Sequence, residues 1–191
     1  MSPLDKLLWA FIGLLLTVVG TFIPVSAPLS PWNWSSGNVP SLSLGVTYQI
    51  GAVLLTGCLG GKSAAALSQI VYLMLGLSGF QIFAYGGGLN YIKEPTFGYL
   101  LGFVPGAWIC GRLAFQKVAR LEFLAISCLA GLSAIHLVGL LYLGGLTLFR
   151  FLAQSWGSAA IEYSLQPLPG QLVLICLVTV VSAILRRVLF Y

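Results

Sequence analysis

The chain has 191 residues, of which 59% are hydrophobic and 7% are charged, and its mean hydropathy is +1.00. Soluble domains carry about 25% charged residues, so this composition excludes a soluble globular protein and indicates an integral membrane protein. The net charge of +5 does not indicate nucleic-acid binding, because the basic residues are scattered at the ends of apolar runs and form no patch.

Apolar runs divide the chain into six candidate membrane helices, since a bilayer core requires about 20 apolar residues per helix. The runs lack the polar–apolar alternation of barrel strands, so helices are expected. We predict an all-α integral membrane protein with a single transmembrane domain over 1–191. Its six transmembrane helices are predicted over 7–23, 42–59, 63–83, 96–115, 123–146 and 170–185.

Basic residues set the expected orientation. With both termini in the cytoplasm, all Lys and Arg residues except Lys93 and Arg150 fall on the cytoplasmic side. The positive-inside rule therefore predicts cytoplasmic termini. We expect a multi-pass protein of the plasma membrane. The long connections 24–41, 84–95 and 147–169 then lie outside, where we expect the functional face. In an alternative, 7–23 is a cleaved signal peptide, which leaves five helices in the same orientation.

The first outer connection and the next helix carry aromatic and polar candidates. Trp32 and Trp34 are expected to anchor the chain at the membrane interface, or to belong to a loop that covers a pocket. Tyr48 and Gln49 follow near the outer end of the second helix. An amide in an apolar run usually faces the protein interior or a cavity, so both residues are candidates for ligand binding.

A serine and the single histidine raise an enzymatic alternative. Ser78 lies in a Gly-x-Ser-Gly motif, and His136 lies two helices later at a comparable depth, which would suit a Ser–His intramembrane protease. The motif is short, however, and the first outer loop shows no second protease element. We therefore expect His136 to be a hydrogen-bonded interior residue.

The connection before the fourth helix reads GGGLNYIKEPTFGYLLGF over 86–103. Pro95 suits the first turn of a helix, and Glu94 is expected at or beside its N-cap. One interpretation is a capped helix after a glycine loop. The other is a ligand site, whose candidate residues are Gly87, Gly88, Asn90, Tyr91, Lys93, Glu94, Thr96 and Tyr99.

Small residues follow within this fourth helix. Gly98, Gly102, Gly106 and Cys110 recur every four residues, which predicts close packing against another helix of the bundle. Together with Cys58, Cys128 and Cys176, Cys110 lacks the spacing of a metal or disulfide motif. We expect the cysteines to be small buried hydrophobes, with no metal.

The last helix begins at Leu168-Pro169-Gly170-Gln171, again from the outside. Two helix N-termini that open on one side of the membrane favour an anionic group there, such as a small carboxylate. Lys93 or Arg150 could supply a full positive charge. Gln171 joins the candidate binding residues.

Three stretches together resemble the BioY family, the biotin-binding S components of energy-coupling-factor (ECF) vitamin transporters. They are TYQIGAVLLTG over 47–57, YLMLGLSGFQIF over 72–83 and the 86–103 motif. The resemblance implies an S-component-like bundle that binds biotin from outside and associates with a transmembrane coupling subunit and two ATPase subunits. It implies neither catalysis nor a cofactor, and the chain has no GxxxxGK[ST] motif for ATP.

Biotin fits the candidate residues chemically. Its ureido ring offers two N–H donors and one carbonyl, and its fused rings and valeryl chain are apolar and suit aromatic walls. Matching polar groups are available on Gln49, Asn90, Glu94, Tyr99 and Gln171. Many other small vitamins would satisfy the same groups, so an S component for another vitamin remains an alternative, as does a membrane scaffold that transports nothing.

Two departures from the family pattern limit what the resemblance implies. Relatives typically begin the last helix with Pro-Gly-Asp-x-x-Lys, whereas this chain has Gln171 and Leu174 at the charged positions. We hypothesise that Lys93 and Glu94 take over that role. The Ala-x-x-x-Ala motif for contact with the energising module is also missing from the first helix, where Gly13 and Thr17 are the nearest small pair.

Overall fold

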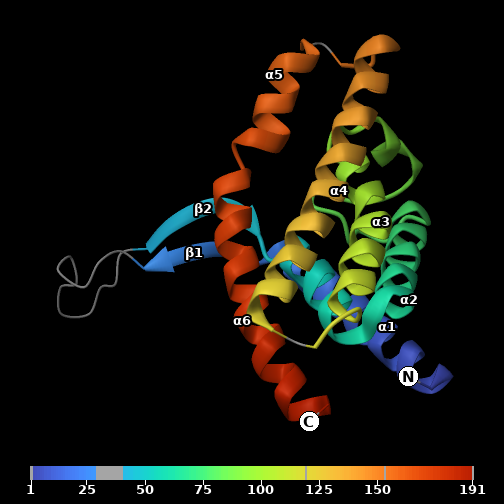
Figure 1. The fold of residues 1–191 in the computed structure, drawn as a ribbon. Helices are drawn as coiled ribbons and strands as arrows, with labels where there is room; N and C mark the ends of the chain where they lie inside the picture. Colours follow the sequence, from blue (N-terminus) through green and yellow to red (C-terminus); the bar gives the residue numbers. More distant parts are fainter. Residues whose placement is uncertain (1, 29–40, 119, 153, 191) are drawn as a thin grey trace, which may run out of the picture.

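The computed structural model describes residues 2–28, 41–118, 120–152 and 154–190, so Trp32 and Trp34 lie outside the described residues. The described part is mostly helical, and five of its helical segments are long and apolar enough to cross a membrane. The helices pack side by side as one bundle, and both chain ends lie at the same end of it (Figure 1).

Helix α1 (Pro3–Phe22) begins at a capping box, in which Ser2 and Asp5 exchange side-chain-to-backbone hydrogen bonds. Its small residues face inward. A Cβ at Gly13 would meet Thr56 of the second helix, and Thr17 is fully buried. The small pair Gly13 and Thr17 therefore packs within this chain, and the outward face of α1 carries large apolar side chains.

Strands β1 (Pro24–Pro28) and β2 (Ser41–Thr47) form an antiparallel hairpin that projects sideways from the bundle (Figure 1). Here the expectation of a helix from residue 42 is wrong. The segment SLSLGVT alternates polar and apolar residues with the period of a strand. Gly45, at a φ of +68°, also adopts a conformation that other residues rarely take.

Helix α2 (Gln49–Leu77) turns back on itself at Gly61, whose φ of 74° is not helical. In a straight helix Gln49 and Tyr72 would lie about 35 Å apart. Instead, Gln49 Nε2 donates a hydrogen bond to Tyr72 Oη over 2.9 Å. The segment is therefore a helical hairpin, with its bend at the glycine pair before Lys62.

The chain leaves α2 earlier than the predicted end at residue 83. Gly79, at a φ of +104°, directly follows the C-cap Ser78 and ends the helix as a left-handed glycine does. The chain then folds back over the helix end, where the backbone N–H of Gly88 donates to the Gly76 carbonyl over 2.7 Å. At Gly87 a Cβ would lie 2.1 Å from the Phe80 carbonyl oxygen, so the glycine run allows this close return.

The 3₁₀ helix η2 (Leu89–Lys93) leads into α3 (Phe97–Ala114). The N-cap of α3 is Thr96, so the expectation of Glu94 at or beside the N-cap is wrong. The carbonyl of Glu94 instead accepts from the N–H of Phe97 over 3.1 Å, which forms a turn ahead of the helix. The Glu94 side chain is exposed.

Helices α3 and α4 (Leu121–Leu148) pack closely, as the four-residue spacing predicted. A Cβ at Gly98 would meet Tyr142 at 2.3 Å, and one at Gly102 would lie 2.7 Å from the Ile135 carbonyl oxygen. The glycine face of α3 is thus a contact within this bundle.

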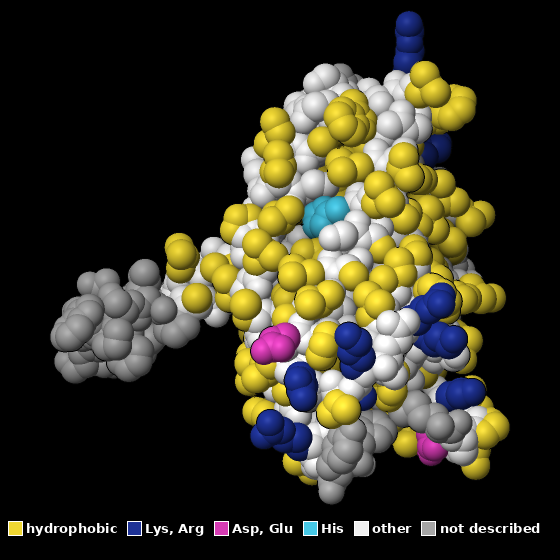
Figure 2. Space-filling view, in the orientation of Figure 1, with side chains coloured by type: hydrophobic (Ala, Val, Ile, Leu, Met, Phe, Trp, Pro, Cys, Tyr) yellow, Lys and Arg dark blue, Asp and Glu magenta, His cyan; other side chains and the backbone are white. Residues whose placement is uncertain are grey.

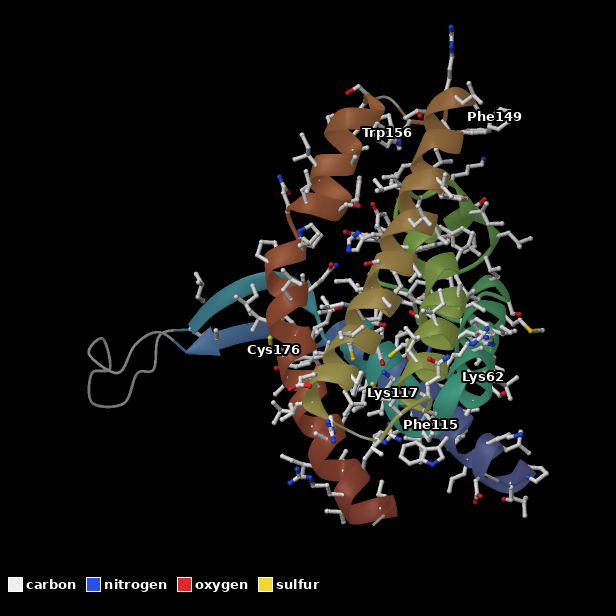
Figure 3. All side chains as sticks on the ribbon, in the orientation of Figure 1. Lys62, Phe115, Lys117, Phe149, Trp156 and Cys176 are labelled. Carbon is white, nitrogen blue, oxygen red and sulfur yellow. The ribbon has the colours of Figure 1, made fainter. Side chains whose placement is uncertain are left out.

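The last connection is largely helical. Helix α5 (Trp156–Ala160) continues into a π-helical turn, η3 (Ile161–Leu165), and α6 (Leu168–Phe190) follows after a short break. Most Lys and Arg side chains lie near the end of the bundle that holds the termini, as Figure 2 shows. Lys62 and Lys117 lie toward that end, whereas Phe149 and Trp156 lie at the other (Figure 3).

Candidate functional site

A cavity of about 460 Å³ lies among β2, α2, α3, η3 and α6. Its position follows from the fold, because the break between η3 and α6 occurs where α3 begins, so the ends of several elements surround one space. Aromatic rings, three helix starts and three amide side chains line it. The predicted residues that line it are Gln49, Tyr91, Thr96, Tyr99 and Gln171.

The amide of Gln49 has a defined orientation in this cavity. Tyr72 has one hydroxyl proton, which it donates to the Ile82 carbonyl over 2.9 Å, so its oxygen accepts from Gln49 Nε2 over 2.9 Å. Tyr72 is fully buried, which holds this arrangement in place. The carbonyl oxygen of Gln49 has no partner among the described residues, so it can accept a hydrogen bond from a ligand N–H.

The amide of Gln171 is oriented from the opposite side by a buried relay. His136 Nε2 lies 2.7 Å from Gln171 Oε1, and His136 Nδ1 lies 3.1 Å from the Ser164 hydroxyl. The Tyr99 hydroxyl lies 2.6 Å from Ser164 Oγ. With Gln171 Oε1 accepting, the histidine proton sits on Nε2 and Nδ1 accepts from Ser164, which in turn accepts from Tyr99.

This relay uses every polar atom of the four side chains except the Gln171 Nε2 amide group. All four side chains are at least nine-tenths buried, and three belong to helices that are far apart in sequence. The free amide group can therefore donate to a ligand carbonyl. Gln49 and Gln171 together offer one acceptor and one donor to the same cavity.

Aromatic side chains form a wall of the cavity. Tyr91 packs against Phe83, with ring centroids 4.7 Å apart, and against Phe97 at 6.4 Å. Its hydroxyl lies 3.2 Å from Thr96 Oγ1. Burial raises the pKa of Tyr91 above its usual value, so the phenol stays neutral at physiological pH. The wall is therefore uncharged and suits an apolar ring system.

The charge of the cavity differs from the expectation. Glu162, from η3, is the charged residue that lines it. Lys93 instead lines a separate groove, with Leu89 and Tyr142, and Glu94 is not among the lining residues. Lys93 and Glu94 therefore do not line this cavity, and the hypothesis that they replace the missing family charges stays a prediction.

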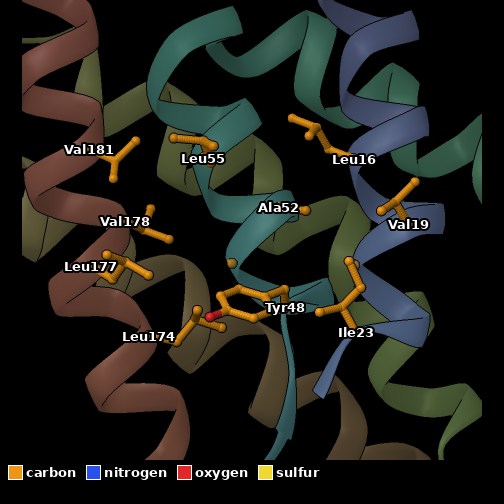
Figure 4. A pocket seen from close by; sticks show the side chains of 12 residues that line it. Leu16, Val19, Ile23, Tyr48, Ala52, Leu55, Leu174, Leu177, Val178 and Val181 are labelled. Atoms are coloured by element: carbon orange, nitrogen blue, oxygen red, sulfur yellow. The ribbon is translucent and has the colours of Figure 1, made fainter. Parts of the chain in front are cut away.

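The other predicted residues also lie apart from the cavity. Tyr48 lines an apolar groove of about 230 Å³ between α1, α2 and α6, where it lies among aliphatic side chains (Figure 4). Gly87 and Gly88 shape the return of the chain over α2, and Asn90 is exposed on η2. None of these four residues lines the cavity, and their part in ligand binding stays a prediction.

Several lining or supporting residues were not anticipated from the sequence. Glu162, Tyr163 and Gln166 come from 147–169, which was predicted only as an outer connection, and Ser164 joins the relay from the same turn. A signal was present, because Ser155 is a typical N-cap residue and begins a helical turn with the spacing to bury Ser164. Nothing local could place His136 beside it.

The Ser–His protease alternative does not fit this arrangement. The Ser78 hydroxyl donates to the Met74 carbonyl over 2.7 Å and is exposed at the end of α2. Both ring nitrogens of His136 are engaged by Ser164 and Gln171. Among the described residues, Ser78 and His136 therefore form no nucleophile–base pair.

Comparisons with known proteins agree on the family. The BioY family model matches residues 1–190. The chain is 33% identical to an uncharacterised 21.2 kDa protein of Cyanophora paradoxa, over 96% of this chain and 95% of that one. It is 37% identical to the biotin transporter BioY of Thermotoga maritima, over 72% and 73% of the two chains.

A solved structure has the same fold. The S-component for biotin from an ECF-type ABC transporter superposes with a TM-score of 0.73, over 98% of this chain and 95% of that chain. The two sequences are 19% identical, so the likeness concerns the fold alone.

Proposed function

The chain belongs to the BioY family, and on this premise we propose that it captures biotin from the outer face of a membrane and carries it across. It acts as the substrate-binding S component of an ECF transporter and not as an enzyme. The relatives described as biotin transporters support this substrate.

The observation that carries the proposal is the pair of oriented amides. A ureido group presents N–H donors on its two sides and a carbonyl between them. Gln49 Oε1 accepts from one of these N–H groups, and Gln171 Nε2 donates to the carbonyl. Tyr72 holds the first amide and His136 holds the second, each through a hydrogen bond shorter than 3 Å. The site is thus preorganised for a neutral ureido ring.

The rest of the cavity suits the rest of the ligand. Its volume of about 460 Å³ lies within the range of about 300–1,000 Å³ found for small-molecule sites. The aromatic wall at Tyr91 packs on the fused rings, and Phe103 and Leu100 cover the apolar chain. The helix starts at Thr96 and Pro167 add partial positive charge to the cavity, which favours an anionic ligand.

The topology we propose has six membrane spans with both termini in the cytoplasm. The five long helical elements become six spans when α2 is counted as two, because it folds back at Gly61. Basic residues gather toward the end that holds the termini, which the positive-inside rule assigns to the cytoplasm (Figure 2). The cavity then opens toward the outside of the plasma membrane.

The partners we propose are a transmembrane coupling subunit and two ATPase subunits of an ECF module. Nothing in the chain supplies energy, since no phosphate-binding loop is present in the sequence. The small residues of α1 are buried against α2, so contact with a coupling subunit uses the larger side chains of its outer face, such as Leu8, Phe11 and Leu15.

Thermal stabilisation of the purified protein by a panel of vitamins tests the substrate. A ligand at a thousandfold excess over its Kd stabilises the folded state by about 4 kcal/mol, so biotin is expected to raise the melting temperature. A shift with another vitamin and none with biotin would overturn the substrate and keep the transporter class. No shift with any vitamin would favour the scaffold alternative.

A further inference from the structure

Three cysteines that are distant in sequence meet in the interior of the bundle. Cys58 of α2 lies 3.7 Å from Cys110 of α3 and 3.5 Å from Cys128 of α4, measured between sulfur atoms. All three sulfurs lie within 4.8 Å of one another. Three different helices therefore each contribute one thiol to the same cluster, although the spacing of the cysteines along the sequence does not indicate a metal site.

Glycines on α2 and α4 allow α3 to pack closely enough for the three thiols to meet. A Cβ at Gly57 would lie 3.1 Å from Cys110 Sγ, and one at Gly131 would lie 3.0 Å from Cys110 Cβ. Cys110 thus sits between two positions that have no side chain, one on α2 and one on α4. Larger residues at either position would push the thiols apart.

The facing side of α6 adds polar groups to an otherwise apolar contact. Ser182 lies beside the Cys58 thiol and Thr179 lies beside the Cys128 thiol. Both hydroxyls are buried, and among the described residues neither makes a hydrogen bond of normal length and angle, although each faces a thiol. Buried hydroxyls without partners are costly, and their position suggests a further binding partner at the thiols.

A positive charge lies on the same face of α6. Arg186 follows Ser182 by four residues, is 6% exposed and donates from Nη1 to the Ala114 carbonyl over 2.6 Å. Its charge acts on Cys58. Its guanidinium carbon also lies 4.3 Å from the centroid of the Phe115 ring, so a negative group formed at the thiols would have a positive charge near it.

We propose that Cys58, Cys110 and Cys128 form a site for a thiophilic d¹⁰ metal ion, with zinc as the representative ion, that fastens α2, α3 and α4 together. A tetrahedral ion with metal–sulfur bonds of about 2.3 Å holds its sulfurs about 3.75 Å apart. The observed separations of 3.5 and 3.7 Å agree with that edge. The hydroxyl of Thr179 or Ser182 completes the four ligands.

Charge and protons balance in this scheme. Binding of a divalent ion to three thiols releases their three protons and leaves a singly negative cluster, and the positive charge of Arg186 acts on that cluster through Cys58. Cys110 gives up the hydrogen bond that its thiol donates to the Leu54 carbonyl. Because ligand thiols must deprotonate, the metal affinity falls as the pH is lowered.

Metal titration of the purified, reduced, full-length protein in detergent tests the site. Cadmium serves as the probe because its thiolate complexes absorb in the ultraviolet, and bound zinc is measured by mass spectrometry. We expect one ion per chain. Cys58→Ser, Cys110→Ser and Cys128→Ser are each expected to lower the affinity by at least about tenfold. Cys176→Ser is the matched control, because Cys176 is exposed on α6 (Figure 3).

The outcomes separate this site from the biotin cavity. Each variant is checked for a biotin-induced rise in melting temperature, and Cys→Ala replaces Cys→Ser wherever the serine variant fails to fold. No tight metal binding by the wild-type chain overturns the proposal, as does full binding by the serine or alanine variants. A mass lower by two hydrogens in the protein before reduction, which marks a disulfide, also overturns it. None of these results bears on the biotin-binding proposal, which does not depend on the metal.

Discussion

The donor role of Gln171 leads to a sharp test with the substitution Gln171→Glu. The carboxylate keeps the shape of the side chain and still accepts from His136 Nε2, which the wild-type oxygen meets at 2.7 Å. It removes the N–H group that we assign to the ureido carbonyl. A ligand carbonyl left without its donor costs about 1–3 kcal/mol, so the Kd for biotin is expected to rise roughly 5- to 150-fold.

The measurement is biotin affinity by calorimetry, together with the melting temperature of the ligand-free protein. The melting temperature is expected to fall, because the new carboxylate is buried beside His136, so affinities are compared under conditions in which every variant is folded. Gln166→Glu is the matched control, since Gln166 lines the same cavity, is exposed and receives the same new charge. Wild-type affinity in Gln171→Glu, or an equal loss in Gln166→Glu, would refute the donor assignment.

Three further substitutions and one control substitution probe charge and packing. Glu162→Gln removes the negative charge that lines the cavity and is expected to strengthen binding of the biotin anion severalfold in calorimetry, with no gain for the neutral amide of biotin; an equal gain for both ligands would contradict the electrostatic reason. Gly102→Ala places a Cβ 2.7 Å from the Ile135 carbonyl oxygen, so the free energy of unfolding should fall by about 1–3 kcal/mol. A lower melting temperature is the expected readout. Gly145→Ala meets nothing within 4 Å and is expected to leave the melting temperature unchanged; a similar loss in both variants would argue against close α3–α4 packing as the cause. Gly61→Ala strains the bend of α2, where φ is 74°, and should lower thermal stability by about 1 kcal/mol or more; an unchanged melt would show that the bend tolerates a side chain.

The sequence by itself determined the class of the protein and much of its outline. Composition requires a membrane protein because so few charges leave almost nothing to face water. The apolar runs, the basic residues at one side and the four-residue glycine spacing before Cys110 depend on the local chain and its solvent. They led to the bundle, to the α3–α4 contact and, through the resemblance, to the BioY family.

The tertiary structure alone decided which polar side chains meet. Gln49 and Gln171 were candidates from the sequence, but their donor and acceptor roles depend on Tyr72 and His136, which lie far away along the chain. Lys93 was an equally reasonable candidate from its charge, yet it faces another groove. Helix rotation and register set these outcomes, and they follow from packing over the whole bundle.

The cysteines illustrate the same division. Their apolar surroundings predicted that they would be buried, and three of them are. No spacing along the chain could predict that Cys58, Cys110 and Cys128 converge, because each belongs to a different helix and the glycines that admit Cys110 lie on its neighbours. Burial depends on residue type and local hydropathy, whereas convergence depends on which helices lie side by side.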